Sequence, residues 1–283
     1  MLVEGSQRYA DALTDRHHAG PVAFATNDTI DRGVDIATLD ALADRAPLLS
    51  VSDLVAGYGG TEVLHGVDLR IRAGQSLCLI GPNGAGKSTV LHAIYGFADI
   101  RHGTIVVDGD DITRQRASDK LRRAGIGYVL QDSSVFPDMT VEENLLMGGF
   151  LMEKPSEAKR AAEQVFEKYD RLARRRRHAA KVLSGGERRL LEIARALMMD
   201  PPIVLVDEPS IGLEPRSIDL VFEILDELKR VRGKTVIMVE QNAKKGLAFA
   251  DIGYVLVSGR VVRAATGAEL LEDSDVGRLF LGG

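Results

Sequence analysis

The chain has 283 residues, of which 45% are hydrophobic, enough for one core of ordinary size with a small appended subdomain. No run approaches the roughly 18 apolar residues that a membrane span requires, and the N-terminus lacks a secretory signal pattern, so we expect a cytoplasmic protein. The formal net charge of -5 at pH 7 gives no general attraction to nucleic acid. The single cysteine, Cys78, lies in an apolar run, which favours a small buried hydrophobe over a catalytic thiol.

The first 47 residues differ in character from the rest of the chain. Acidic, small and polar residues are scattered through them, and only the stretch from Ile30 to Leu42 has a rough helical spacing. We therefore predict a flexible N-terminal extension over residues 1–47 with one nascent helix, bounded by Pro47. Residues 48–283 are predicted to form a single domain.

Short β-rich runs alternate with helical patterns from Leu48 onward. The predicted strands are Leu48–Val55, Val67–Ile71, Leu77–Ile80, Ile105–Val107, Ile126–Leu130, Ile203–Val206, Thr235–Val239 and Tyr254–Val257, and the predicted helices include Glu157–Arg174, Glu187–Met198 and Ser217–Val231. Helix formers with charged faces over about residues 133–190 indicate a helical subdomain. The alternation predicts an α/β fold with a parallel sheet covered by helices. No internal repeat is visible, so a second nucleotide site would have to come from a second chain.

A glycine-rich segment links the strand ending at Ile80 to a helical stretch that begins near Thr89. Its residues are Gly81, Pro82, Asn83, Gly84, Ala85, Gly86, Lys87 and Ser88, which match the pattern G-x-x-x-x-G-K-[ST] of a phosphate loop. Glycines let successive backbone N–H groups and the helix N-terminus face a phosphate. Lys87 would neutralise the β- and γ-phosphates, and Ser88 would ligate Mg²⁺. The alternative is a glycine-rich turn with a chance lysine.

Two carboxylates end the apolar strand Ile203–Val206. Asp207 and Glu208 would lie at the carboxyl end of a strand, where ligands bind in such sheets. We expect Asp207 to hold the magnesium shell and Glu208 to polarise the attacking water. The alternative is that the two acids are only the polar start of a loop. Without the phosphate loop, the sequence would not distinguish these two interpretations.

A third motif stands between these two. It consists of Leu183, Ser184, Gly185, Gly186 and Glu187. A serine and two glycines at a helix start present a hydroxyl and backbone N–H groups as an anion site, although an ordinary capped helix has the same pattern. In this order along the chain, the three motifs resemble those of ABC-type ATPases.

The resemblance implies a fold with a RecA-like parallel sheet, an antiparallel β subdomain and an inserted α-helical subdomain. It also implies that two such domains pack head to tail, so that each signature, Ser184 to Gly186 here, caps ATP held by the partner's phosphate loop. Tyr58 resembles the aromatic that stacks on adenine, although a core or turn tyrosine is the alternative. Gln131 resembles the glutamine that touches magnesium and relays nucleotide state to the helical subdomain. Ser210 to Glu214 resembles the loop that crosses the dimer interface, with Glu214 in place of the usual aspartate.

One position departs from most of the family. Gln241 stands where a histidine is usual, and a glutamine can hydrogen-bond a γ-phosphate oxygen but cannot take up a proton near neutral pH. The string Val239-Glu240-Gln241-Asn242-Ala243 resembles the ATP-binding proteins of branched-chain amino-acid importers. Further stretches that resemble this subfamily are Met139–Leu145, Met147–Gly149, Glu208–Leu213 and Leu281–Gly283.

The resemblance implies several partners. They are a second, homologous ATP-binding subunit, two membrane permeases and, indirectly, an extracytoplasmic solute-binding protein, which would place this chain peripherally on the cytoplasmic face of the membrane. Phe136 and Met139 are candidates for the groove that receives a permease helix, with core packing as the alternative. The basic run Arg174–Arg177 is interpreted as a solvated helix face rather than a nucleic-acid site.

Several other kinds of protein would carry the same motifs and are alternative interpretations of this sequence. They are an importer of urea or short amides, a lipopolysaccharide-export ATPase, a soluble ABC protein acting on ribosomes or DNA, and a binding module with little hydrolysis. The absence of a second ATPase domain or a long coiled coil disfavours the soluble protein, and Glu208 disfavours the binding module.

Overall fold

The computed structural model describes residues 33–131 and 134–280. Two sheets form the framework of these residues, with strand orders β2-β1-β4-β5 and β10-β9-β3-β8-β7-β6. The strands of the first sheet are β1 Leu49–Tyr58, β2 Thr61–Ile71, β4 Asp99–Val107 and β5 Asp110–Asp111, and its pairings are antiparallel. The strands of the second are β3 Ser76–Ile80, β6 Ile126–Val129, β7 Ile203–Asp207, β8 Thr235–Val239, β9 Ile252–Val257 and β10 Arg260–Thr266, and only the β9–β10 pair is antiparallel.

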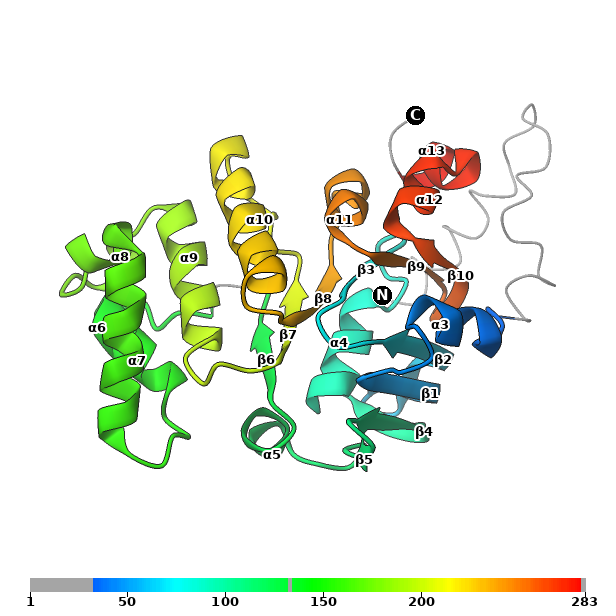
Figure 1. Cartoon of the computed structure of the whole chain (residues 1–283), viewed down its shortest axis with the longest axis horizontal. Helices are drawn as coiled ribbons and strands as arrows, with labels where there is room; N and C mark the ends of the chain where they lie inside the picture. The colour runs from blue at the N-terminus through cyan, green and yellow to red at the C-terminus, as the bar shows by residue number, and fades with distance from the viewer. Residues whose placement is uncertain (1–32, 132–133, 281–283) are drawn as a thin grey trace.

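Helices cover both faces of the parallel sheet and form a separate group at one end (Figure 1). Around the sheet lie α3 Ile36–Leu42, α4 Lys87–Tyr95, α5 Ala117–Arg122, α10 Pro215–Arg230, α11 Ala243–Phe249, α12 Gly267–Glu272 and α13 Ser274–Phe280. The group at the end, inserted between β6 and β7, consists of α6 Val141–Gly148, α7 Pro155–Lys168, α8 Asp170–Arg174, the short 3-10 helix Ala180–Val182 and α9 Gly185–Ala196. The three parts implied by the resemblance are therefore present: a parallel sheet, an antiparallel sheet and a helical insertion.

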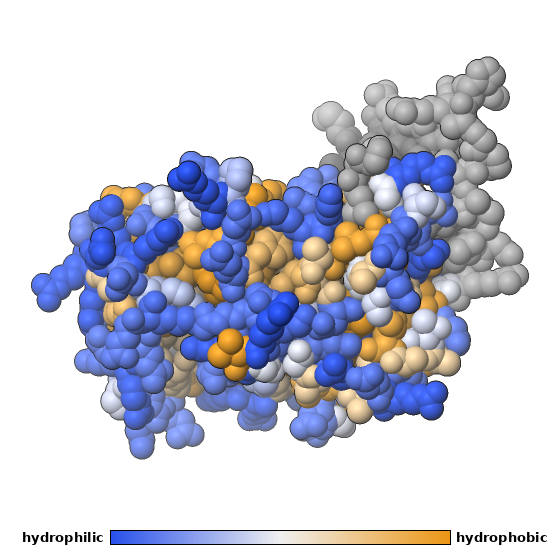
Figure 2. Space-filling model, turned by 45° about the horizontal axis from the view of Figure 1, so that its top comes forward, coloured by the Kyte–Doolittle hydropathy of each residue, from blue (hydrophilic) through white to orange (hydrophobic). Residues whose placement is uncertain are grey.

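The buried strands of the parallel sheet are apolar except at their ends, where Ser76, Asp207 and Thr235 lie, as expected for a sheet covered on both faces. Every residue of β3, β7 and β8 is buried. Helix α4 contacts strands of both sheets, so the helix that begins in the phosphate loop also joins the two layers. Figure 2 shows apolar side chains gathered along the middle of one face, among the polar side chains that cover most of it.

The prediction of one helix over Glu157–Arg174 is wrong, because the helix breaks at Tyr169 (φ -119°, ψ 84°). Phe166 and Leu172 are both buried in the same hydrophobic cluster. In a continuous helix with 3.6 residues per turn these positions would lie about 120° apart around the axis, and the break allows both side chains to reach one core. The strand β10 was not predicted.

The described part of the expected N-terminal extension, residues 33–47, packs on the domain. Leu39 of α3 is fully buried in the main core, the Leu42 carbonyl accepts a hydrogen bond from Gln75 Nε2 at 2.8 Å, and Asp44 pairs with Arg72 at 2.6 Å. Ile30 and the segment Leu281–Gly283 lie outside the described residues. The structure therefore adds a packed helix, α3, to the predicted domain of residues 48–283.

We predict that Leu39→Ala lowers the free energy of unfolding by about 2–5 kcal/mol, because it leaves a cavity in the core. Thermal unfolding followed by circular dichroism measures the change. Ile36→Ala on the same helix is the matched control, since Ile36 is 43% exposed. A loss for Leu39→Ala no larger than that for Ile36→Ala would contradict the prediction.

Candidate functional site

The predicted phosphate loop connects the buried strand β3 to the first turn of α4. Gly81 has φ +151°, and a Cβ at this position would lie 2.0 Å from the Leu256 carbonyl oxygen of β9. Only glycine fits there, because the loop leaves the sheet in contact with neighbouring backbone. Lys87, the first residue of α4, is 6% exposed, and its Nζ donates to the carbonyls of Gly81 and Pro82 at 2.9 and 3.0 Å. Burial lowers the pKa of Lys87, while Glu208 and Asp207 act in the opposite direction.

Asp207 lies at the end of β7 beside the phosphate loop. Its carboxylate accepts hydrogen bonds from Ser88 Oγ at 3.0 Å and from the Tyr128 hydroxyl at 3.1 Å. Burial raises the pKa of Asp207 in spite of these two bonds. The structure thus brings together two of the predicted magnesium ligands, Ser88 and Asp207, and adds a tyrosine that was not predicted.

Glu208 is in the left-handed region of backbone conformation, with φ +43°. This costs a non-glycine residue about 1–3 kcal/mol and is typical of functional sites. Its backbone N–H donates to the Val239 carbonyl at 2.9 Å, and its side chain accepts a hydrogen bond from Gln131 Nε2 at 2.9 Å. Burial, together with the charge of Asp207, raises the pKa of Glu208.

Lys87, Ser88, Gln131 and Glu208 line a cleft of about 490 Å³. Its lining includes the predicted residues Asn83, Gly84, Gly86, Lys87, Ser88, Thr89, Gln131, Glu208 and Gln241. Val63 and Ile211 also line it and were not predicted. Five separate segments of the sequence therefore line this cleft.

Tyr58, the predicted adenine platform, does not line this cleft. It ends β1, is 40% exposed and hydrogen-bonds His92 of α4 through its hydroxyl. Val63 of β2 does line the cleft.

The signature motif begins α9. Ser184 Oγ accepts a hydrogen bond from Glu187 N at 3.3 Å, and Glu187 Oε2 accepts one from Ser184 N at 2.9 Å, which completes a capping box. A Cβ on Gly186 would lie 2.6 Å from Ser217 Oγ of α10, so glycine is required by close packing. Ser184, Gly185 and Gly186 do not line the phosphate cleft of their own chain, and Gly185 instead lines a smaller cavity with Gln131 and Ile211.

Arg189 of α9 was not predicted, yet it connects the signature helix to the sheet. It is 5% exposed and donates to the carbonyls of Leu130 and Asp207 at 2.7 and 3.0 Å. It also pairs with Glu192 at 2.9 Å. A buried arginine on a charged helix face gives no local sequence signal, because apart from Glu192 its partners are carbonyl groups of other segments.

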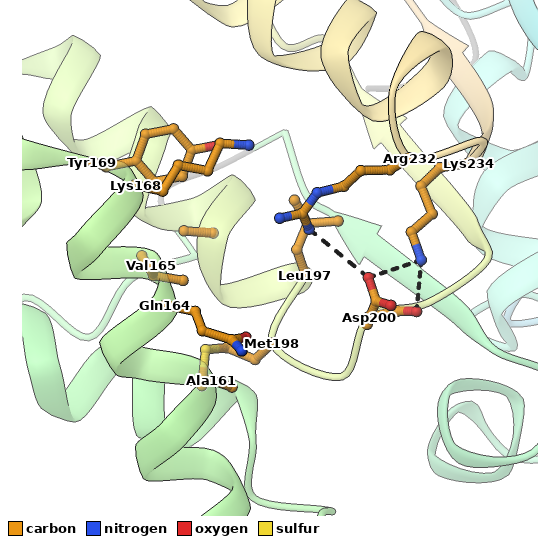
Figure 3. Close-up of a pocket in the computed structure, with 11 residues that line it drawn as sticks. Ala161, Gln164, Val165, Lys168, Tyr169, Leu197, Met198, Asp200, Arg232 and Lys234 are labelled. Atoms are coloured by element: carbon orange, nitrogen blue, oxygen red, sulfur yellow. Dashed lines mark hydrogen bonds and ion pairs between the residues drawn. The ribbon is translucent and has the colours of Figure 1, made fainter.

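Another cavity, of about 430 Å³, lies between the helical insertion and the sheet domain (Figure 3). Its three cations, Lys168, Arg232 and Lys234, each have a carboxylate partner. Lys168 pairs with Glu227, and the other two pair with Asp200. This cavity contains none of the predicted site residues, so the nucleotide chemistry belongs to the cleft at the phosphate loop.

The residues around the cleft suit a hard cation bound together with a nucleotide. Hydroxyl, carboxylate and amide oxygens come from Ser88, Asp207 and Gln131, and Mg²⁺ prefers one or two such protein ligands completed by phosphates and water. No group of three or more histidine, cysteine or acidic side chains in the described residues could hold a metal alone. Within residues 33–131 and 134–280, no helix is long and apolar enough to span a membrane.

The fold and cleft define a phosphate-loop ATPase. The sequence profile of the ABC transporter family matches residues 64–211, more than half of the chain. The chain belongs to this family of ATP-hydrolysing subunits and is an ATPase.

Curated relatives match most of the chain. A high-affinity branched-chain amino acid transport ATP-binding protein, BraG of Pseudomonas aeruginosa, is 41% identical over 83% of this chain and 100% of its own length. A probable branched-chain amino acid transport ATP-binding protein, LivF of Archaeoglobus fulgidus, is 34% identical over 83% of this chain and 99% of its own length. The lipopolysaccharide export system ATP-binding protein LptB of Haemophilus influenzae is 32% identical over 83% of this chain and 97% of its own length.

Solved structures agree with this assignment. A nucleotide-free ATP-binding cassette from an ABC transporter has a TM-score of 0.73 at 28% identity and covers 84% of this chain and 100% of its own. A dimeric ATP-binding cassette bound to ADP and Pi has a TM-score of 0.68 at 27% identity and covers 77% of this chain and 98% of its own. The predicted fold class is confirmed.

We predict that Asp207→Asn stabilises the nucleotide-free protein at neutral pH. Because burial raises the pKa of Asp207, its contribution to stability is full below the ordinary aspartate value of 3.8 and is lost as the pH rises through the higher folded value. Thermal melts between pH 4 and 8 test this, with Asp110→Asn, an exposed site in β5, as control. A melting temperature of Asp207→Asn below that of wild type at pH 7 would contradict the prediction.

Proposed function

We propose that this chain is the ATP-binding and ATP-hydrolysing subunit of an ABC importer that takes up branched-chain amino acids. The observation that carries the ATPase part is that Lys87, Ser88, Gln131 and Glu208 line one cleft. Asp207 is hydrogen-bonded to Ser88, and Gln131 is hydrogen-bonded to Glu208. The 41% identity to BraG and the Gln241 string support the solute class.

In the proposed ATP complex, the loop from Gly81 to Ser88 wraps the phosphates with its backbone N–H groups. Lys87 would exchange its two carbonyl acceptors for phosphate oxygens, a stronger charge-assisted pairing. Tyr58, at the end of β1, would meet the adenine ring after giving up its bond to His92. Pro82 and Ala85 complete the loop as backbone contributors.

Ser88, Asp207 and Gln131 would hold Mg²⁺, which neutralises charge on the phosphates. Glu208, with its pKa raised, would accept a proton from the attacking water as a general base. Gln241 would hydrogen-bond the γ-phosphate from the opposite wall. Gln131, which now donates to Glu208, would release that carboxylate as it turns toward the metal.

The signature motif supports a partnership with a second ATP-binding subunit. Ser184 to Gly186 form a capped helix start that does not line the cleft of their own chain, so a phosphate reaching them would come from another chain. The two subunits would then enclose two ATP molecules head to tail.

A groove of about 510 Å³ is the proposed docking surface for a permease. Phe136, 42% exposed, lines it beside Met147 and Phe150 and lies against the Arg195 guanidinium. Met139 does not line this groove. Two permeases and, through them, an extracytoplasmic solute-binding protein would complete the importer, with this chain on the cytoplasmic face.

A second candidate is the ATPase of a lipopolysaccharide exporter, supported by the 32% identity to LptB. Importers of urea or short amides form a third. The identity of the co-purifying membrane subunits separates these functions.

Glu208→Gln is predicted to retain ATP binding and to lower turnover at least about a hundredfold, since it removes the general base. Phosphate release and nucleotide affinity are measured on the chain assembled with its partner subunits. Glu223→Gln, at an exposed site of α10, serves as control. Turnover of Glu208→Gln equal to that of the control would refute the catalytic role.

Removal of this subunit from its host is predicted to abolish high-affinity uptake of radiolabelled leucine. Wild-type chain should restore uptake and Glu208→Gln should not, because transport depends on hydrolysis. Glucose uptake controls for general damage. Normal leucine uptake in the deletion strain would exclude the branched-chain solute class.

A further inference from the structure

Glu240 is a buried acid that the proposed mechanism does not use. It follows the last residue of β8 and precedes Gln241, and only 1% of its surface is exposed. It does not line the phosphate cleft. Burial of a charge in this way is costly unless its partners are specific.

One oxygen of this carboxylate joins two loops. Glu240 Oε1 accepts a hydrogen bond from Ser210 Oγ at 2.7 Å and another from the Asn242 backbone N–H at 2.8 Å. Ser210 stands two residues after Glu208, and Glu240 stands one residue before Gln241. The carboxylate therefore ties together the segments that carry two proposed catalytic groups.

The Ser210 side of this contact belongs to a loop between two cavities. Ile211, the next residue, is 45% exposed and lines both the phosphate cleft and the cavity that Gly185 lines. A shift of this loop would therefore change both cavities. The bond from Ser210 sets where the loop lies relative to Gln241.

The other oxygen, Glu240 Oε2, is buried and has no hydrogen-bond partner in the described structure. The side chain is held by packing instead. A Cβ on Gly246 of α11 would lie 2.6 Å from Cys78 Sγ and 3.0 Å from Glu240 Cβ, so there is no free space on this side. The side chain is therefore fixed by the two hydrogen bonds of Oε1 and by packing against α11.

We propose that Glu240 is a positioning residue that locks the loop from Ser210 to Leu213 to the Gln241 turn, so that both walls of the cleft move as one unit. A second subunit that touches the exposed Ile211 would thereby also place Gln241. The inference rests on the roles proposed for Glu208 and Gln241. The charge of Glu240 also contributes, after burial and Asp207, to raising the pKa of Glu208.

Three variants in the assembled complex test this link. Ser210→Ala removes the hydroxyl donor. Glu240→Leu replaces the carboxylate with an apolar side chain of similar size and so removes both hydrogen bonds that it accepts. Glu240→Gln retains an acceptor oxygen. We expect the first two to lower kcat about tenfold, as loss of a hydrogen bond to a charged group implies, with the KM for ATP within about twofold of wild type. Glu240→Gln should recover most of kcat.

Ser76→Ala is the matched control. Ser76 is fully buried, and its Oγ donates to Asp251 Oδ2 at 2.9 Å at the opposite end of the same sheet. It should lower the melting temperature and leave kcat unchanged. Wild-type kcat in Ser210→Ala, or an equal loss of kcat in Ser76→Ala, would overturn the positioning role. Glu208→Gln is measured in the same assay. If it loses turnover while Ser210→Ala does not, the positioning role fails and the proposed catalytic site stands.

Discussion

The parallel order β3-β8-β7-β6 is the constraint on which the site depends. Parallel strands end at the same edge of a sheet, so the segments that follow them meet there. The phosphate loop follows β3, Glu208 follows β7, Gln241 follows β8 and Gln131 follows β6. Changing this order would separate residues that now line one cleft, even with every local motif intact.

Electrostatics make this edge responsive to ligands. Burial raises the pKa of Asp207 and Glu208 and lowers the pKa of Lys87, so each charged form is disfavoured without a ligand. A bound cation would lower the pKa of the two acids, and phosphate would raise that of the lysine. Cation and phosphate would each offset the cost of burying the charges, which favours binding of nucleotide and metal together.

Sequence patterns predicted the fold class and most of the residues at the cleft, because the phosphate loop and the strand ending in Asp207 are local signals. These contacts of Tyr128, Arg189 and Glu240 could not be predicted, since the partners lie 18 to 79 positions away in sequence. The break at Tyr169 was also not predicted. The local sequence has a helical pattern there, and the break depends on tertiary packing. Tyr58 was selected by resemblance, and its role at adenine stays a prediction.

The proposed head-to-tail arrangement is tested most directly with a variant of the signature motif, by measuring its ATP binding and its association with a second subunit. Sedimentation velocity would compare Glu208→Gln with Glu208→Gln/Gly185→Asp, each mixed with a second ATP-binding subunit, with and without ATP and Mg²⁺. Gly185 is chosen because a Cβ there would lie 3.5 Å from Leu213 Cδ2, an ordinary contact. The isolated double variant should bind ATP as tightly as Glu208→Gln, because its signature serves the partner's site, but it should fail to associate on ATP addition. Weakened ATP binding by the isolated, correctly folded double variant, or unchanged association, would contradict a site shared between chains.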